Sequence, residues 1–183
     1  MKVPYIQHRG WTLSEDYNIV ETLSHIRHKH KGERIGFLTG CFDLLHIGHV
    51  KCLEEARRLC DRLIVGVMDD TYVRDAKGIG RPLQPLEHRL AIIKSVRHVD
   101  DTLPVESDLT IFEEALKSLR PDCYVKGGDN EFFIDSLSEI PLVRKLGIAI
   151  KLTRHFGHVS TTSLVHASST SASHVEFGRT DRT

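Results

Sequence analysis

Short apolar runs alternate with helix-like segments along most of this chain of 183 residues. The sequences RIGFLTG (34–40) and DRLIVGVM (61–68) are too short for isolated helices, but they fit strands buried in a parallel sheet. Two further runs, DCYVKG (122–127) and IAIKLT (148–153), have the same character. Because strands that alternate with helices form βαβ units, we predict an α/β fold. This would be a Rossmann-like, doubly wound parallel sheet with helices on both faces, in a single domain.

The segments between these runs have helical spacing. Leu53, Ala56 and Leu59 share one face of a helix predicted over residues 46–60. Further helices are predicted over residues 14–30, 86–99, 109–119 and 138–146. Three parts result: an N-terminal helical extension over residues 1–31, a domain over residues 32–165, and a Ser/Thr-rich tail over residues 166–183 that we expect to be disordered.

Composition argues against several classes of function. The 25 Lys and Arg residues balance the 25 Asp and Glu residues, so there is no general basic excess and no nucleic-acid partner is expected. No run of roughly 18 apolar residues predicts a membrane span, and the N-terminus lacks the apolar core of a signal peptide. The four cysteines lack CxxC spacing, so we interpret them as reduced thiols of a cytoplasmic chain without a membrane partner.

The turns after the predicted strands are where we expect the chemistry. In parallel α/β sheets, ligands bind beyond the carboxyl ends of the strands. The turns concerned are residues 40–49, 69–85, 126–131 and 153–162. In the first, GCFDLLHIGH, a strand pattern changes into a helix pattern around His46 and His49. Gly40 and Gly48 would let the backbone approach a ligand and leave N–H groups free at a helix N-terminus, which favours phosphate.

The two histidines predict a site that handles phosphate. Their three-residue spacing puts both side chains on one side of the first helical turn, where they can donate to phosphoryl oxygens. Phosphoryl and nucleotidyl transfer depend on such positioning and charge stabilisation, with little covalent work by the protein. Two other interpretations are surface histidines at a helix start and a metal site, which the lack of a third nearby ligand disfavours.

The stretch GCFDLLHIGHVKCLEEAR (40–57) resembles the HxGH signature of the cytidylyltransferase-like nucleotidyltransferases. Counterparts follow in the same order: LTGCFD (38–43), DRLIVGVMDD (61–70), GRPLQPLEHR (80–89), PDCYVKGGDN (121–130) and VSTTSLV (159–165). Within the superfamily, KGERIGFLTGCFD, RPLQPLEHR and VKGGD are most similar to the adenylyltransferase domain of ADP-heptose synthases. Glycerol-phosphate and ethanolamine-phosphate cytidylyltransferases come next. The resemblance covers roughly residues 32–165, which would be the nucleotidyltransferase domain.

The resemblance implies a reaction in which a phosphorylated acceptor attacks the α-phosphate of a nucleoside triphosphate and pyrophosphate leaves. The expected nucleotide is ATP with Mg²⁺, and the expected acceptor is a sugar 1-phosphate such as heptose 1-phosphate. One alternative is a cytidylyltransferase for glycerol 3-phosphate or another small alcohol phosphate. A second is a non-catalytic, nucleotide-binding sensor of the same fold. Because many relatives are dimers, a homodimer is also an expectation.

The resemblance also implies roles for individual residues. His46 and His49 would stabilise charge on the α-phosphate and the bridging oxygen, and Lys77 would close over the triphosphate from a flexible loop; these three would be catalytic. Asp43 and Asp70 would lie near the acceptor or the metal ion, for which no dedicated protein cage is expected. Nucleotide contacts are expected from Gly40, Cys41, Phe42, Gly48, Arg89, Lys126, Gly127, Asp129, Ser160, Thr161 and Thr162.

Some of these residues also have plainer interpretations. Asp43 could cap the helix, Lys77 could be a solvated loop lysine, and Arg89 could be a surface arginine beside Glu87. Residues 160–162 could be an ordinary helix N-cap. The stretch HFGHVS (155–160) departs from the RTxGIS of cytidylyltransferases, because His155 stands where their arginine is expected. This departure favours ATP over CTP, and it leaves Arg154 or His158 as candidates to supply the missing charge.

Overall fold

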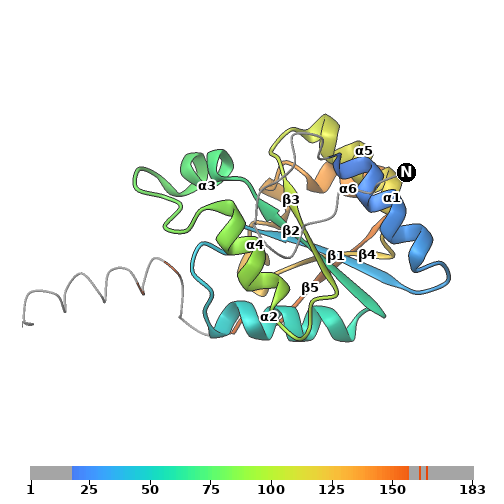
Figure 1. Ribbon diagram of the computed structural model, residues 1–183, viewed down its shortest axis with the longest axis horizontal. Coiled ribbons are helices and arrows are strands. Elements are labelled where there is room, and N and C mark those ends of the chain that lie inside the picture. The colour runs from blue at the N-terminus through green and yellow to red at the C-terminus, as the bar shows by residue number, and fades with distance from the viewer. Residues whose placement is uncertain (1–17, 157–160, 162–163, 165–183) are drawn as a thin grey trace, which may run out of the picture.

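The computed structural model describes residues 18–156, 161 and 164. The predicted tail, residues 1–17 of the N-terminal extension and the predicted site residues Ser160 and Thr162 lie outside this part of the chain. Its centre is a five-stranded sheet with the strand order β3-β2-β1-β4-β5 (Figure 1). Every pairing between neighbouring strands is parallel. The predicted Rossmann-like parallel sheet is therefore confirmed.

The elements alternate along the chain as the sequence patterns predict. The strands are β1 (Ile35–Gly40), β2 (Arg62–Met68), β3 (Asp101–Val105), β4 (Cys123–Lys126) and β5 (Ala149–Leu152). The α-helices are α1 (Ile19–Lys29), α2 (Ile47–Arg58), α3 (Asp70–Lys77), α4 (Leu86–Lys94), α5 (Leu109–Leu119) and α6 (Ile140–Lys145). Two 3₁₀ turns, Gly128–Asn130 and Ile134–Ser136, follow β4. Within the described residues, no helix combines the length and apolar character needed to cross a membrane.

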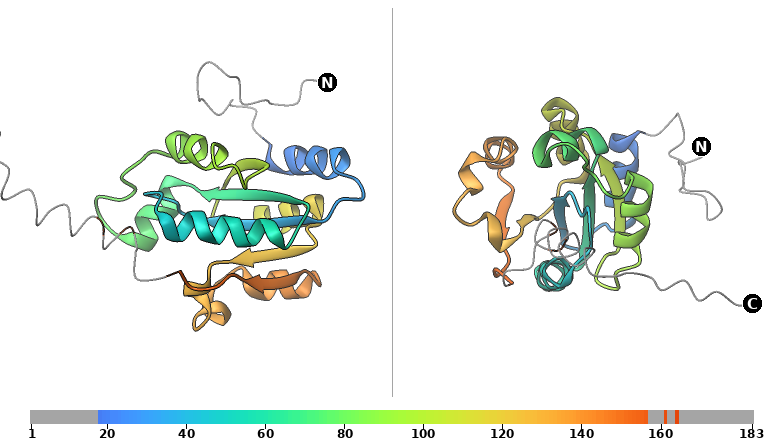
Figure 2. Two further views of the ribbon diagram at one scale, coloured as in Figure 1. Left: turned by 90° about the horizontal axis from the view of Figure 1, so that it is seen from below. Right: turned by 90° about the vertical axis from the view of Figure 1, so that its left-hand side faces the viewer.

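Helices cover both faces of the sheet (Figure 2). Helices α1, α5 and α6 pack on the face that carries Phe37 and Tyr124. Helices α2 and α4 pack on the opposite face, which carries Leu38 and Val125. Neighbouring residues such as Phe37 and Leu38 enter different cores because successive side chains of a strand point to opposite faces. Strands β1 and β2 are buried on both sides, which explains why they are apolar without alternation.

Three elements differ from the predictions made from the sequence. Strand β3, with the sequence DTLPV, was not predicted, because it is short and contains Pro104. It tolerates this proline as an edge strand paired with β2 alone. Residues 70–77 form α3 where a turn was expected, and the Asp69 side chain caps it by accepting from the Tyr72 N–H at 2.7 Å. The helix predicted over residues 86–99 ends at Lys94, before the chain turns towards β3.

The topology places the site. The chain runs from β1 outward to β3, and it then returns to place β4 and β5 on the other side of β1. The winding therefore reverses between β1 and β4, and a crevice is expected there beyond the carboxyl ends of the strands. Gly40 ends β1 and Lys126 ends β4, so both lie at this point of reversal.

Candidate active site

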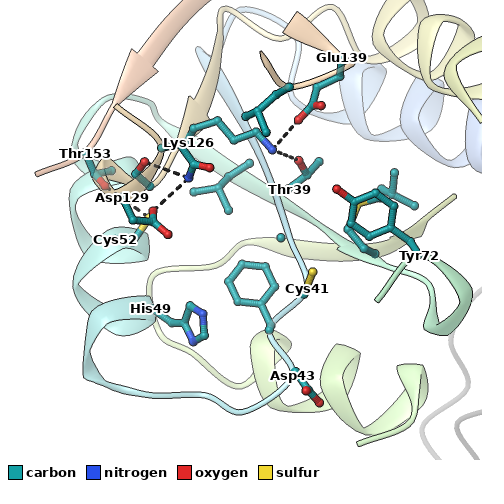
Figure 3. A pocket seen from close by; sticks show the side chains of 18 of the residues that line it. Thr39, Cys41, Asp43, His49, Cys52, Tyr72, Lys126, Asp129, Glu139 and Thr153 are labelled. Carbon is teal, nitrogen blue, oxygen red and sulfur yellow. Dashed lines mark hydrogen bonds and ion pairs between the residues drawn. The ribbon is translucent and has the colours of Figure 1, made fainter. Parts of the chain in front are cut away.

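A cavity of about 560 Å³ lies at the carboxyl ends of the strands. Figure 3 shows residues from β1, α2, α3 and β4 converging on it. The predicted site residues that line it are Gly40, Cys41, Phe42, Asp43, His46, Gly48, His49, Lys77, Lys126, Gly127, Asp129 and Thr161. Asp70 and Arg89 are not among its lining residues. The structure thus brings together twelve residues drawn from four separate stretches of the sequence.

The two histidines lie at the start of α2. His46 is the N-cap residue, with extended backbone, and its N–H donates to Nδ1 of His49 at 3.4 Å. The two rings stack with centroids 3.7 Å apart, and the Phe42 ring meets His49 edge-on at 5.2 Å. A Cβ on Gly48 would lie 3.0 Å from Nδ1 of His46, so glycine leaves room for this ring against the helix. The pair is therefore held together beside the free N–H groups of the helix end.

Burial lowers the pKa of both histidines. The pKa of His49 falls to about 4 because its ring is desolvated, and because His46 and Lys77 add positive charge nearby. Burial also lowers the pKa of His46, again with the help of Lys77 and against the attraction of Asp129. Nδ1 of His46 is buried without a hydrogen-bond partner among the described residues. Both rings are neutral at pH 7, so each can donate one hydrogen bond without presenting a full charge to the cavity.

Lys77 is the last residue of α3, and the expectation that it belongs to a loop is wrong. The loop begins at the next residue, because Gly78 and Gly80 both have positive φ angles of 92° and 86°. Lys77 lines the cavity, and no carboxylate among the described residues pairs with it. It therefore offers a cation to an anionic ligand.

Asp43 anchors the loop that follows α3. Its carboxylate is buried and accepts from Nη1 of Arg81 at 2.5 Å and from the Leu83 N–H at 2.6 Å. It makes no hydrogen bond to α2 within the described residues, whose N-cap is His46, so the helix-cap interpretation is wrong. Asp43 ties the end of β1 to residues 81–84 and so shapes one wall of the cavity.

Arg89 is completely buried, so the interpretation as a surface arginine is wrong. Its guanidinium donates to the backbone carbonyls of Cys41 at 2.6 Å and Met68 at 2.7 Å. It also donates to the Gln84 carbonyl at 3.0 Å and to Asp70 at 2.5 Å. These bonds join the ends of β1 and β2 to the loop before α4. The geometry thus assigns Arg89 and Asp70 to holding the cavity wall together.

A cluster of four side chains, which we call the polar cluster, lines the cavity between β1 and β4: Thr39, Tyr124, Lys126 and Glu139. Nζ of Lys126 lies 2.6 Å from Oε1 of Glu139 and donates to Oγ1 of Thr39 at 3.1 Å. The Tyr124 hydroxyl donates to Oε1 of Glu139 at 3.2 Å and contacts Oγ1 of Thr39 at 2.5 Å. Only Lys126 was among the predicted site residues, because nothing local marks Thr39, Tyr124 or Glu139 as neighbours.

The positive charge of Lys126 and the negative charge of Glu139 balance each other within the polar cluster. Burial raises the pKa of Glu139, but the Lys126 ammonium, together with hydrogen bonds from Lys126 and Tyr124, outweighs this and leaves the pKa lowered. Burial, then the nearby Glu139 charge, raises the pKa of Tyr124 well above its ordinary value, so its hydroxyl stays protonated and can donate. The cluster therefore contains an ionised carboxylate paired with one lysine.

The turn after β4 closes the cavity against the segment after β5. A Cβ on Gly128 would overlap the Thr153 carbonyl and the His155 N–H, so only glycine fits there. Asp129 lines the cavity, and its Oδ1 accepts from the Asn130 amide at 3.0 Å. Arg154, a candidate to supply the missing charge, forms an ion pair with Glu55 of α2 at 2.6 Å.

Thr161 is the only residue of the predicted STT turn within the described part of the chain. It is buried, and its hydroxyl donates to the Leu44 carbonyl at 3.4 Å, close to the histidine pair. His158, the second candidate for the missing charge, lies outside the described residues, as do Ser160 and Thr162. No group of three or more potential metal ligands occurs among the residues that the structure describes.

Comparison with known proteins gives consistent matches. A family model described as cytidylyltransferase-like matches residues 37–172. The bifunctional protein HldE of Alcanivorax borkumensis is 40% identical over 135 residues, which are 74% of this chain and 28% of that protein. HldE of Acidiphilium cryptum is 48% identical over 103 residues, which are 56% of this chain and 21% of that protein. The chain thus spans less than a third of the length of these curated relatives.

Two solved structures have a similar fold. The lipopolysaccharide core biosynthesis protein from Thermoplasma volcanium is 32% identical, with a TM-score of 0.55, and the match covers 70% of this chain and 100% of that chain. The pantoate-β-alanine ligase from Francisella tularensis, solved with a β,γ-ATP ligand and β-alanine, is 15% identical with a TM-score of 0.53. That match covers 82% of this chain and 75% of the ligase, and at this identity it supports the fold alone.

Proposed function

The chain belongs to the cytidylyltransferase-like family of nucleotidyltransferases, and from this premise we propose that it transfers AMP from ATP to a sugar 1-phosphate. In this reaction an oxygen of the acceptor phosphate forms a bond to the α-phosphorus of ATP. The bond from the α-phosphorus to the bridging oxygen breaks, and pyrophosphate leaves with the electron pair. The products are the nucleoside diphosphate sugar and pyrophosphate.

The observation that carries this proposal is the stacked histidine pair at the N-terminus of α2, inside a cavity that also holds Lys77. Charge develops on the α-phosphate oxygens and on the leaving pyrophosphate during transfer, and preorganised donors stabilise it. The neutral histidines and the helix N–H groups supply such donors, and Lys77 supplies positive charge. Burial raises the pKa of the Cys41 thiol, so this nearby cysteine is not poised as a nucleophile, in keeping with direct transfer.

Mg²⁺ is proposed as the cofactor, bound mainly by the nucleotide. Magnesium usually keeps several waters and binds through substrate phosphates with one or two carboxylates. Asp43 is occupied by Arg81, whereas Oδ2 of Asp129 has no partner among the described residues. The side chains present therefore fit a phosphate-borne ion with Asp129 as its protein ligand. When bound, the ion would neutralise charge on the phosphates.

ATP is proposed over CTP for two reasons. The motifs are most similar to an adenylyltransferase domain, and His155 stands where cytidylyltransferases are expected to have an arginine. The guanidinium of the neighbouring Arg154 is held by Glu55. A sugar acceptor is supported by the similarity to a lipopolysaccharide core biosynthesis protein and to HldE. In this proposal the domain works without a nucleic-acid partner.

A pyrophosphate-release screen tests the proposal. ATP, CTP, GTP and UTP are each combined with Mg²⁺ and with heptose 1-phosphate, mannose 1-phosphate, glycerol 3-phosphate or phosphoethanolamine, and the His49→Ala protein reports contaminating activity. We expect release with ATP and a sugar 1-phosphate. Preference for CTP with glycerol 3-phosphate would replace this proposal with the cytidylyltransferase alternative. Binding of ATP without release for any acceptor would instead indicate a nucleotide sensor.

A further inference from the structure

The cavity has a second half that phosphate chemistry does not require. The histidine pair lies at the start of α2, whereas Tyr124 of the polar cluster lies on the face of the sheet that α5 and α6 cover. Figure 3 shows His49 on one side of the cavity and Thr39, Lys126 and Glu139 on another. The end of β1 separates them, because alternate residues of a strand point to opposite faces: Thr39 shares the face of Phe37, whereas Leu38 is on the face covered by α2. In-line transfer places the acceptor and the leaving pyrophosphate on opposite sides of the α-phosphorus. If the histidines and Lys77 hold the triphosphate, the body of the acceptor lies against the polar cluster.

Glu139 has hydrogen-bonding capacity that the polar cluster does not use. Oε1 takes the hydrogen bonds from both Lys126 and Tyr124. No other residue among those described donates to Oε2, although the side chain is only 16% exposed. A carboxylate oxygen that lines a cavity can accept hydrogen bonds from water or from a ligand. A ligand that brings hydroxyl groups into the cavity would donate to Oε2 in place of water.

The surroundings of Glu139 suit hydroxyl groups better than a second phosphate. Two of the four carboxylates that line the cavity, Glu106 and Glu139, lie near the hydroxyls of Ser107 and Ser138 in the chain. Lys126 is the lysine of this half, and Glu139 and Thr39 already occupy two of its three N–H donors. Carboxylates accept from hydroxyl groups, whereas they repel anions.

We propose that Glu139 selects the acceptor by receiving hydrogen bonds, through Oε2, from the hydroxyl groups of a polyhydroxylated sugar phosphate. The inference rests on the proposed function, because that function supplies the two substrates that share the cavity. Lys126 and Tyr124 are positioning residues, since they hold Oε1 and so direct Oε2 into the cavity. Glu139 discriminates among acceptors and takes no part in the bond-making step.

The substitution Glu139→Gln tests this role with little change of shape. The amide oxygen can still accept from Lys126 and Tyr124, so the NH₂ group takes the place of Oε2 and presents donors where the acceptor stood. We expect the Kd of heptose 1-phosphate, titrated by calorimetry in the presence of Mg²⁺ and a non-hydrolysable ATP analogue, to rise about 10–100-fold. The Kd of the ATP analogue should change less than about twofold. Glu113→Gln is the matched control, because Glu113 pairs with two lysines outside the cavity.

The remaining outcomes separate failure of the inference from failure of the proposed function. If the ATP analogue loses affinity while heptose 1-phosphate keeps it, Glu139 reads the ribose hydroxyls of the nucleotide. If neither affinity changes, the acceptor lies elsewhere. If wild-type protein binds the ATP analogue and releases pyrophosphate with glycerol 3-phosphate but binds no sugar phosphate, nucleotidyl transfer stands and the inference falls. If it binds heptose 1-phosphate through Glu139 but no nucleotide, the inference stands and the proposed function falls.

If the variant does not fold, the inference can be tested on wild-type protein by changing the sugar phosphate instead. Monodeoxy analogues of mannose 1-phosphate are titrated into wild-type protein under the same conditions. The inference expects removal of at least one hydroxyl to weaken binding about 10-fold or more. Equal affinities across the whole series would overturn it. Where the variant does fold, its Kd for the deoxy analogue that binds wild-type protein weakly should be no higher than its Kd for mannose 1-phosphate itself.

Discussion

Replacing Arg89 with methionine should destabilise the protein severely, because this buried side chain joins the ends of β1 and β2 to the loop before α4. Methionine restores much of the aliphatic volume, so the loss is one of hydrogen bonds. Arg89 is fully buried and donates to three backbone carbonyls and one carboxylate. A hydrogen bond from a charged group contributes about 1.5–3 kcal/mol, but such contributions do not add fully. Breaking a buried charged network costs about 3–5 kcal/mol.

Urea denaturation followed by circular dichroism measures this loss. With a slope of about 2 kcal/mol per molar urea, the midpoint should fall by about 1.5–2.5 M. This is a large part of the roughly 5–15 kcal/mol by which domains are usually stable. Arg58→Met is the control, because Arg58 is exposed and, among the residues that the structure describes, pairs only with Glu54 on the same helix; it should cost less than about 1 kcal/mol. Equal midpoints for the two variants would refute the assignment of Arg89 as the residue that holds this wall together.

Three further predictions follow from the site. His49→Ala should keep the fold and lower kcat by about 10²–10³, whereas the exposed His25→Ala should not; near-normal turnover would exclude the proposed mechanism. Because the pKa of His49 is lowered from 6.5 to about 4 in the folded state, the unfolded chain binds more protons between these values. The free energy of unfolding should therefore fall as the pH drops from 6.5 towards 4, by up to about 3 kcal/mol from this residue, and denaturation of His49→Ala should lack this part of the decrease. Gly128→Ala should lower the melting temperature and impair binding of the ATP analogue, because its methyl group would overlap the Thr153 carbonyl; an unchanged melting temperature would show that the backbone gives way.

Most of the fold could be predicted from periodicity. Strands β1 and β2 are apolar throughout because both faces of the sheet are covered, and this pattern is visible without any partner. Strand β3 escaped prediction because an edge strand needs fewer apolar residues and tolerates Pro104. Helix α3 escaped prediction because it has only eight residues and buries only Val73, so the sequence shows no repeated row of core residues there.

The prediction of the site agrees best with the structure for residues that are close together in the sequence. The spacing of His46 and His49 after a strand was enough to expect a pair at a helix start, and the pair stacks there. The interpretations of Asp43 as a helix cap and Arg89 as a surface residue were wrong, because each side chain binds a partner about 40 residues or more away. The sequence around Asp43 does not indicate that its carboxylate accepts a hydrogen bond from Leu83.

The sequence by itself determined the alternation of strands and helices, the edge of the sheet at which the candidate site lies, and the motif that carries the histidine pair. Only the tertiary structure decided which polar residues face one another there. Thr39 and Lys126 are 87 residues apart and meet because the chain places β4 beside β1. Glu139 joins them from the start of α6. Periodicity reports which face of an element is buried, but it carries no information about the side chain that a neighbouring element places opposite. The half of the cavity that we assign to the acceptor therefore became visible only in the folded chain.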